Sequence, residues 1–346
     1  MDFNEKVKEI NSLLEQHNTF RGDCLNLIAS ENVPSPLVER LLVEDLDQRY
    51  GNYSGIDLRT RFTKGIGSSS RSRNGAGTGK ATLRRGTIAL IQKHRPKLVT
   101  IGSGVFLFPQ PVRELKEAMN RYAPDSYLIY DAAHVMGLIA GGRFQSPLAE
   151  GADVIISSTH KTLAGPQGGI ILTNDRSLAE RIGPAVAPLL ESNHHLGRLP
   201  ALAGTFLEWL ACGAEHADAI ISNAKALGQA LHERGIRLSG RTLGFTESHT
   251  LIPIVDEFGE GKAMADQLEA CNIIAGAASV PPELGTHGLR IGVQEVTRRG
   301  MTEADVPEVA DCIVDALKGD DLEGVKRRAT ALAGRFNQMR FTLEGI

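Results

Sequence analysis

The sequence is poor in several features that mark specialised classes of protein. Only four cysteines occur among 346 residues, and they lie too far apart for a zinc motif or a disulfide framework (Cys24, Cys212, Cys271 and Cys312). No long apolar run is present, near the N-terminus or elsewhere, so nothing indicates a membrane span or a targeting signal. We therefore expect a protein of the reducing cytoplasm with no membrane partner.

Charge of one sign and metal-ligand clusters are also scarce. The formal net charge is −3, which does not favour nucleic acid as a partner. Ten histidines are scattered along the chain, and the one adjacent pair, His194 and His195, has no third ligand in view. We therefore predict no metal site.

The most informative stretch covers residues 154–172. Apolar runs at 154–156 and 170–172 flank a loop that contains Lys161, Gly165, Gly168 and Gly169, which predicts a strand, a tight loop and a second strand. A lysine at the end of a buried strand loses hydration, which lowers its pKa and frees a neutral, nucleophilic amine. The bare amides of the glycines can bind phosphate. Together these features suggest a Schiff base with pyridoxal phosphate (PLP); the alternative is a surface lysine in a hairpin loop.

A second strand end supplies the acid that such a cofactor needs. The apolar run 128–130 ends at Asp131, and His134 follows three residues later. PLP requires a carboxylate against its pyridine nitrogen, because the protonated ring is the better electron sink. His134 could lie near the ring oxygen or the substrate. The alternatives are a strand-end cap for Asp131 and a satisfied core histidine for His134.

Several motifs in this order resemble the serine hydroxymethyltransferase family, with its archaeal-type branch as the closest. The match rests on Asp131 and His134, on Thr-His-Lys-Thr at 159–162 with Gly-Pro-Gln-Gly-Gly at 165–169, on Asn-Leu-Ile-Ala-Ser-Glu-Asn-Val-Pro-Ser-Pro at 26–36, and on Gly-Leu-Arg-Ile-Gly at 288–292. Glu-Val-Thr-Arg-Arg-Gly at 295–300 continues the C-terminal signature. The resemblance covers nearly the whole chain except roughly residues 65–86.

The resemblance implies a PLP-dependent transferase of fold type I. This is an α/β fold with a large domain built on a mostly parallel sheet, a smaller α+β C-terminal domain and a homodimeric assembly. It implies catalytic roles for Lys161, His134 and Tyr50. It implies a cofactor site formed by Lys161, Asp131, His134, Ser103, Ser158, His160, Gly168 and Gly169.

The same resemblance places the substrate carboxylate on Ser30 and Arg290. Independently, Arg290 is expected inside a strand, where an unpaired guanidinium is costly and its planar fork suits a carboxylate. The alternatives are an internal salt bridge for Arg290, a helix N-cap region for Ser30 and a plain strand-to-loop turn for Ser103.

The chain departs from the family pattern at two places. Asn52 stands where the family carries a glutamate that shuttles protons in folate-linked transfer, and an amide cannot do this. Residues 65–86 are rich in Gly, Ser and Arg, predict a flexible loop, and replace a longer family segment that carries the phosphate cup and a ring-stacking histidine. Residues 75–82 only partly match a nucleotide-binding P-loop.

Hydrophobic periodicity predicts the following organisation. Residues 1–64 form an N-terminal arm with helices, 65–86 a flexible loop, 87–199 the PLP-binding domain, 200–235 a bridging helix and 236–346 the small C-terminal domain. Helices are expected at 1–19, 37–50, 87–93, 111–123, 178–187, 200–235, 263–271 and 304–317, and strands at 96–101, 127–130, 154–156, 170–172, 250–255 and 289–291. The first helix is expected to pack on the body or on a partner subunit, with core packing favoured.

The predicted function is cleavage or formation of the Cα–Cβ bond of a β-hydroxy amino acid, with tetrahydrofolate as a doubtful co-substrate. Because of Asn52, threonine aldolase or transaldolase chemistry without folate is the first alternative. A shortened paralogue that keeps the fold but neither PLP nor catalysis is the second.

Overall fold

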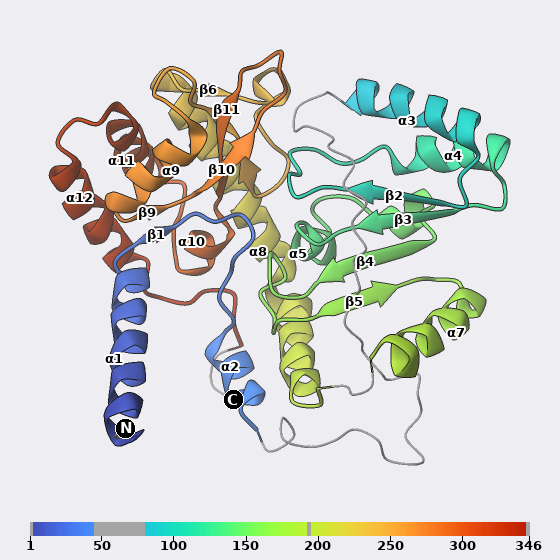
Figure 1. Cartoon of the computed structure of the whole chain (residues 1–346), viewed down its shortest axis with the longest axis horizontal. Helices are drawn as coiled ribbons and strands as arrows, with labels where there is room; N and C mark the ends of the chain where they lie inside the picture. The colour runs from blue at the N-terminus through green and yellow to red at the C-terminus, as the bar shows by residue number, and fades with distance from the viewer. Residues whose placement is uncertain (1–2, 45–79, 192–194, 344–346) are drawn as a thin grey trace.

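The computed structural model describes residues 3–44, 80–191 and 195–343. Two sheets lie on either side of one long helix, α8 (Arg198–Glu233), as Figure 1 shows. This helix contacts elements of both halves, since it packs against α5 (Met136–Ala140) on one side and α11 (Val306–Lys318) on the other. The bridging helix predicted at 200–235 is therefore present with nearly the expected bounds.

One sheet has the strand order β2-β3-β4-β5, and we call it the larger sheet because its strands contain more residues than those of the other. Its first three strands are parallel, and β5 returns antiparallel to β4. The predicted strand, loop and strand around Lys161 are thus confirmed as the β4–β5 pair. The strands are β2 (Leu98–Gly102), β3 (Tyr127–Asp131), β4 (Val154–Ser158) and β5 (Gly169–Leu172).

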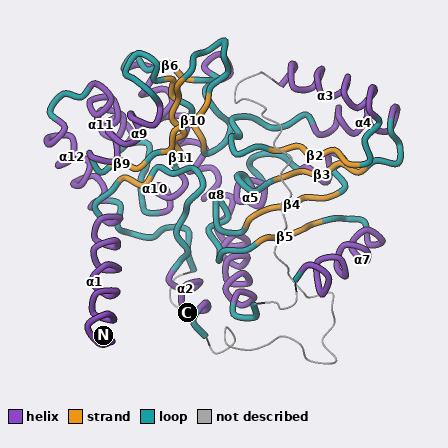
Figure 2. Tube along the Cα trace, viewed as in Figure 1, coloured by secondary structure: helices purple, strands orange, loops and turns teal. Residues whose placement is uncertain are grey.

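Helices accompany this sheet in the alternating order expected of an α/β unit. In α4 (Val112–Tyr122) the buried residues Leu115 and Met119 are four apart, so one face of the helix meets the core. The other helices are α3 (Lys80–His94), α6 (Pro147–Glu150) and α7 (Arg176–Pro184), the last followed by a π-helical turn, η3 (Ala185–Leu190). Figure 2 shows this alternation of helix and strand along the trace.

The smaller sheet is antiparallel and contains the C-terminal part of the chain. Its order is β10-β11-β8-β6, with β7 also paired to β11. The strands are β6 (Arg237–Leu238), β7 (Thr250–Leu251), β8 (Pro253–Ile254), β10 (Gly276–Ser279) and β11 (His287–Gly292). The helices around it are α9 (Gly261–Ala270), α10 (Gln294–Arg298), α11 and α12 (Leu322–Arg335), with a 3-10 turn, η4 (Arg241–Leu243).

The beginning of the chain joins this C-terminal half. Strand β1 (Leu25–Asn26) pairs in parallel with β9 (Ile273–Ile274). Helix α2 (Pro36–Leu42) then packs on α8, with the Ser35 hydroxyl accepting from the Val38 amide as an N-cap. Sequence analysis predicted no strand here, because a two-residue strand leaves no periodic signal.

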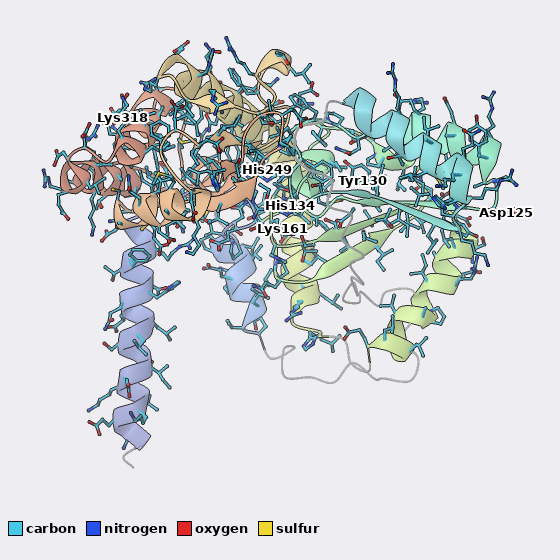
Figure 3. All side chains as sticks on the ribbon, turned by 45° about the horizontal axis from the view of Figure 1, so that its top comes forward. Asp125, Tyr130, His134, Lys161, His249 and Lys318 are labelled. Atoms are coloured by element: carbon cyan, nitrogen blue, oxygen red, sulfur yellow. The ribbon has the colours of Figure 1, made fainter. Side chains whose placement is uncertain are left out.

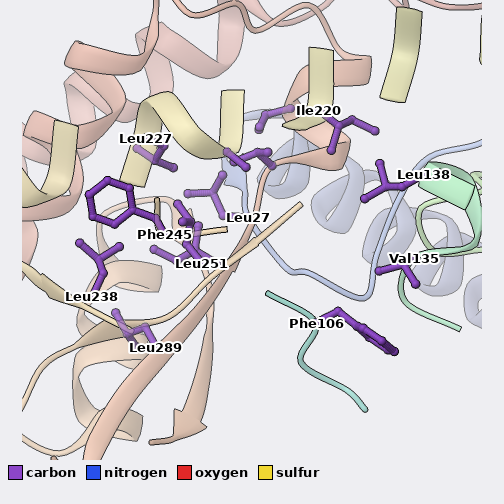
Figure 4. Packing of buried hydrophobic residues seen from close by; sticks show 14 of the residues in the cluster. Leu27, Phe106, Val135, Leu138, Ile220, Leu227, Leu238, Phe245, Leu251 and Leu289 are labelled. Atoms are coloured by element: carbon purple, nitrogen blue, oxygen red, sulfur yellow. The ribbon is translucent and has the colours of Figure 1, made fainter. Parts of the chain in front are cut away.

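One hydrophobic core runs through both halves (Figure 4). It includes Leu128 of β3 and Leu138 of α5 from the larger sheet, and Leu251 and Leu289 from the smaller one. Ile220 of α8 belongs to the same cluster. The two sheets are therefore held in fixed relation by continuous apolar packing.

Three expectations about helices need correction. The helix predicted at 37–50 ends at Leu42 within the described residues. Helix α3 begins at Lys80, so the end of the segment predicted as a flexible loop is helical, and residues 65–79 lie outside the described part. Helix α1 (Phe3–Gly22) does not pack on the body: Val7, Ile10 and Leu14 are all more than half exposed.

None of the helices in the three described ranges has the length and apolar character needed to cross a membrane. The four cysteines are free, and three of them are buried (Cys24, Cys271 and Cys312).

The contact between α5 and α8 depends on a glycine. A Cβ at Gly141 would lie 2.5 Å from the Gly213 carbonyl oxygen and 2.7 Å from the Ala217 Cβ, whereas a Cβ at Gly334 in α12 would meet nothing. We predict that Gly141→Ala lowers the free energy of unfolding by about 1–3 kcal/mol through overpacking. The matched change Gly334→Ala should raise it by about 0.5–1 kcal/mol through helix propensity. Urea titration measures both, and equal effects at the two glycines would contradict the close approach.

Candidate active site

The carboxyl ends of two neighbouring parallel strands bring Asp131 and Lys161 to the same edge of the sheet. Asp131 is the last residue of β3 and pairs with Ile156 of β4, and Lys161 follows β4 after three residues. Ligands of open α/β sheets bind beyond this edge. Figure 3 shows Lys161 and His134 together where the two halves of the molecule meet. The predicted proximity of the acid and the lysine is therefore present.

The loop that carries Lys161 is tightly held by hydrogen bonds. The amides of Ala164 and Gly165 donate to the carbonyls of Lys161 and Thr159 at 2.9 and 2.8 Å. Ala164 has a left-handed backbone with φ of 56°, which closes the turn. The Thr162 hydroxyl donates to the His134 carbonyl at 2.9 Å. The lysine is thus presented from a turn that several hydrogen bonds fix.

Lys161 lies in surroundings that favour its neutral form. Its side chain is half-buried, and burial lowers its pKa from the ordinary value. Arg290 adds to this lowering, whereas Asp131 acts in the opposite direction and raises the pKa. Both charged groups therefore lie close enough to Lys161 to influence its pKa.

A second histidine, His249, accompanies His134. Their rings are nearly parallel, with an interplanar angle of 12° and centroids 6.2 Å apart. His249 donates from Nε2 to the Ala29 carbonyl at 3.0 Å. Burial lowers the pKa of His134 to about 2 and that of His249 to about 4, so both rings are neutral at physiological pH.

Arg290 of β11 reaches across from the smaller sheet. Its guanidinium donates to the Gly104 carbonyl at 2.9 Å and lies 3.5 Å from the Ser30 hydroxyl. No ion pair to Arg290 occurs among the residues that the structure describes, so the salt-bridge alternative is not seen there. A Cβ at Gly104 would lie 3.5 Å from the guanidinium and 3.9 Å from the His134 Nε2. Ser30 and Arg290 therefore form one cluster close to His134.

The remaining predicted residues surround this cluster at the same strand ends. Ser103 precedes Gly104, and its hydroxyl accepts from the Val105 amide at 3.1 Å. Ser158 donates to the Ala133 carbonyl at 3.1 Å, and its strand neighbour across the ladder is Gly169. His160 is half-buried, and burial lowers its pKa. Gly168 accepts from the Thr159 amide through its carbonyl.

The predicted Tyr50 lies outside the described residues, as does Asn52. Two residues that sequence analysis did not assign to the site are found at or beside it. His249 gave only a weak signal, a polar Ser-His-Thr triplet before an apolar run. Trp209 belongs to the buried core, and its Nε1 donates to the Leu163 carbonyl at 2.7 Å, two residues after the lysine.

The residues present fit PLP. The Nδ1 atoms of His134, His160 and His249 are buried and without a hydrogen-bond partner among the described residues. Three orphaned ring nitrogens beside a partly desolvated lysine leave polar capacity that a polar cofactor can use. Lys161 could hold the aldehyde carbon, and the Asp131 carboxylate could pair with a protonated pyridine nitrogen.

Comparison with known proteins gives the same family. A family model described as serine hydroxymethyltransferase matches residues 86–313. The chain is 37% identical to a serine hydroxymethyltransferase of Pyrobaculum aerophilum over 409 aligned positions, which cover 97% of this chain and 94% of the relative. Identity to the serine hydroxymethyltransferase of Sulfolobus acidocaldarius is 34%, over 99% of this chain and 96% of that one.

The alignments also agree with the shortened segment. The 409 and 416 aligned positions exceed the 346 residues of this chain, so both relatives carry residues without a counterpart here. The family model begins to match at residue 86, where the Gly/Ser/Arg segment ends.

A solved structure with the same fold is L-threonine transaldolase from Pseudomonas fluorescens in its internal aldimine state. It superposes with a TM-score of 0.81 and 26% identity, over 98% of this chain and 94% of that one. This likeness confirms the expected PLP-dependent transferase fold type I. The chain belongs to the serine hydroxymethyltransferase family.

Proposed function

We propose that the chain is a PLP-dependent enzyme of the serine hydroxymethyltransferase type, which cleaves or forms the Cα–Cβ bond of a β-hydroxy amino acid. The observation that carries the proposal is that Asp131 and Lys161 leave neighbouring parallel strands at one edge of the sheet, while Arg290 reaches from β11 to the Gly104 carbonyl that follows β2. The names of the relatives support the same chemistry. When bound, PLP supplies an electron sink for the pair released as the bond breaks.

The chain's own residues bind and orient the reactants. Arg290 would donate to the substrate carboxylate, because its guanidinium is partly desolvated and forms no ion pair among the described residues. Ser30, 3.5 Å away, adds a hydroxyl on the same side. The Gly104 carbonyl accepts from the same guanidinium at 2.9 Å, which fixes its position.

The roles of the other site residues follow from their protonation states and their positions. Lys161 supplies a neutral amine, and the Asp131 carboxylate would keep the pyridine nitrogen of bound PLP protonated. His134, neutral and with Nδ1 unpartnered, serves as a hydrogen-bonding group beside the ring rather than as an acid. The cofactor site is completed by Ser103, Ser158 and His160. The family resemblance gives Tyr50 a role across the dimer interface. The loop with Gly168 and Gly169 contributes to the phosphate site of the neighbouring subunit.

We propose the domain organisation of the sequence analysis for this enzyme, with residues 87–199 as the PLP-binding domain and 236–346 as the small domain. The unpaired state of the cysteines supports a reducing cytoplasm.

A second candidate function is folate-independent aldolase or transaldolase chemistry on threonine. The specific observation in its favour is the fold likeness to an L-threonine transaldolase. Asn52, in place of the family glutamate, points in the same direction. A shortened paralogue without PLP is the non-enzymatic rival, because the family's phosphate cup belongs to the segment that this chain lacks.

The spectrum of the purified chain with PLP tests the proposal directly. We predict a visible absorption band of a protonated Schiff base, which Lys161→Ala abolishes because the attacking amine is gone. Lys318→Ala, which changes an exposed lysine on α11, should leave the band unchanged. A chain that shows no band at saturating PLP would support the non-enzymatic rival.

Turnover provides the second arm of this experiment. Glycine formation from serine should depend on tetrahydrofolate, and Arg290→Lys should raise KM for serine about tenfold or more, because a bidentate contact is lost. The matched change Arg237→Lys, at an exposed arginine of β6, should not alter KM. Faster cleavage of threonine without folate would instead favour the aldolase alternative.

The pH dependence of Lys161 labelling tests the electrostatics of the site. The neutral amine is the reactive form, so labelling by trinitrobenzenesulfonate should rise with pH through a midpoint below the ordinary lysine pKa of 10.5. Asp131→Asn removes the charge that favours the ammonium, so the midpoint should fall further. Asp125→Asn, at an exposed turn, should not move it. A higher midpoint in Asp131→Asn would be incompatible with the assigned geometry.

We also propose a homodimer. Leu207 and Leu210 of α8 are 55% and 83% exposed, and the apolar residues of α1 are exposed as well. Apolar side chains in such numbers need a partner. Leu210→Glu should halve the mass measured by sedimentation, whereas Leu243→Glu, at an exposed leucine of the separate turn η4, should leave it unchanged. A wild-type chain that sediments as a monomer would disprove this assembly.

A further inference from the structure

Trp209 connects helix α8 to the lysine loop. Its indole Nε1 donates to the Leu163 carbonyl at 2.7 Å, and both side chains are buried. Without this donor the carbonyl of a buried residue would lose its hydrogen bond, which costs about 1–3 kcal/mol. A Cβ at Gly137 would lie 2.9 Å from the indole ring and 2.4 Å from the Thr162 carbonyl oxygen, so the ring, α5 and the loop are in direct contact.

The indole is fixed in turn by an aromatic stack. The His216 ring lies on Trp209 with centroids 5.0 Å apart and an interplanar angle of 25°. Phe341 stacks on the same histidine at 4.5 Å and 10°. His216 is almost completely buried, and its Nε2 has no partner among the described residues. Phe341 belongs to the segment after α12, more than a hundred residues along the chain from α8.

A buried ion pair fastens that segment. Arg298 of α10 pairs with Glu208 of α8 at 2.9 Å, and both side chains are nearly inaccessible. Arg298 also donates to the Phe341 carbonyl at 3.4 Å, and its own carbonyl accepts from the Arg340 amide at 2.8 Å. The Arg340 guanidinium lies 5.0 Å from the centre of the Phe341 ring. The position of Phe341 is therefore specified by several independent contacts.

We infer that Phe341, His216 and Trp209 form a relay of positioning residues through which the C-terminal segment 340–343 holds the loop of Lys161. None of the three is at the reacting atoms. They act through the Leu163 carbonyl, which fixes the turn that presents the amine. The inference rests on the proposed function only in naming Lys161 as the catalytic amine.

The relay should be visible in the exchange of two loop amides. Those of Ala164 and Gly165 are protected by bonds to the carbonyls of Lys161 and Thr159. In the full chain, each variant in the same state of PLP loading, Phe341→Ala should speed their exchange about five- to tenfold, in line with the loss of one buried hydrogen bond. Trp209→Phe, which keeps a ring but removes the donor, should do the same.

The double variant tests whether the two act in series. If Phe341 acts only through Trp209, adding Phe341→Ala to Trp209→Phe should give no further acceleration. If the accelerations of exchange in the two single variants multiply in the double variant, the inference is overturned. It is also overturned if amide exchange in helix α4 accelerates as much as in the loop, because that would mean general destabilisation. Leu343→Ala, in the same segment but outside the stack, is the matched control and should leave loop exchange unchanged. If Phe341→Ala does not fold, Phe341→Leu removes the ring but keeps apolar bulk.

Fluorescence gives an independent readout, because Trp209 is the single tryptophan of the chain. Burial, with Arg298 and Arg340 nearby, lowers the pKa of His216 well below 6.5. The wild-type emission should therefore stay constant on acidification to pH 5. In Phe341→Ala water reaches the histidine, its pKa rises towards 6.5, and the imidazolium should quench the indole as pH falls.

A variant emission that stays constant over this range would show that Phe341 does not seal the stack, and the inference would fail. Because exchange and fluorescence follow the backbone and the indole, they decide the inference even if Lys161 proves not to bind PLP. Failure of the proposed function and failure of the relay are therefore distinguishable.

Discussion

The parallel pairing of β3 with β4 is the constraint on which the site depends. Register places Asp131 opposite Ile156, so the aspartate and the lysine that follows β4 leave the sheet at one edge. A slip of one residue would turn Asp131 to the other face. Helix α5 packs against the loop that carries Lys161, because Gly137 allows the helix to approach the Thr162 backbone. The register of β3 and β4 and the absence of a side chain at Gly137 thus set the position of Lys161 relative to Asp131.

The site is electrostatically unbalanced in a way that suits its expected ligands. Burial and Arg290 disfavour the charged form of Lys161, Asp131 favours it, and burial disfavours the charged form of Arg290. His134 and His249 stay neutral because burial disfavours their charged forms. Partly desolvated basic groups are stabilised when an anion binds beside them. An amino-acid carboxylate and a phosphate are both anions.

Sequence reasoning reached the parts of the site that local patterns encode. Apolar runs ending at Asp131 and shortly before Lys161 predicted both strand ends, and the strand position of Arg290 predicted its inward guanidinium. The family resemblance supplied Ser30, which no pattern would have joined to Arg290. His249 and Trp209 were not assigned, because their importance arises from contacts with residues far away in the sequence.

The fold, like the site, has elements that local sequence patterns predicted and elements that they did not. Long periodic elements such as α8 were predicted nearly to the residue, whereas β1, β6 and β9, each two residues long, were not. Helix α1 was expected to pack on the body because its apolar spacing is amphipathic, yet those residues are exposed. Periodicity indicates that a face needs a partner, but it does not identify the partner.

The pairing of β1 with β9 has a consequence for the order in which the protein matures on the ribosome. Ser30 and Arg290 are separated by 260 positions, and they meet only after β1 has docked beside β9. The parallel strands with Asp131 and Lys161 can form much earlier, since their contacts are closer in sequence. A nascent chain can therefore form the strands that flank its lysine well before it can hold a carboxylate, and substrate recognition appears late during synthesis.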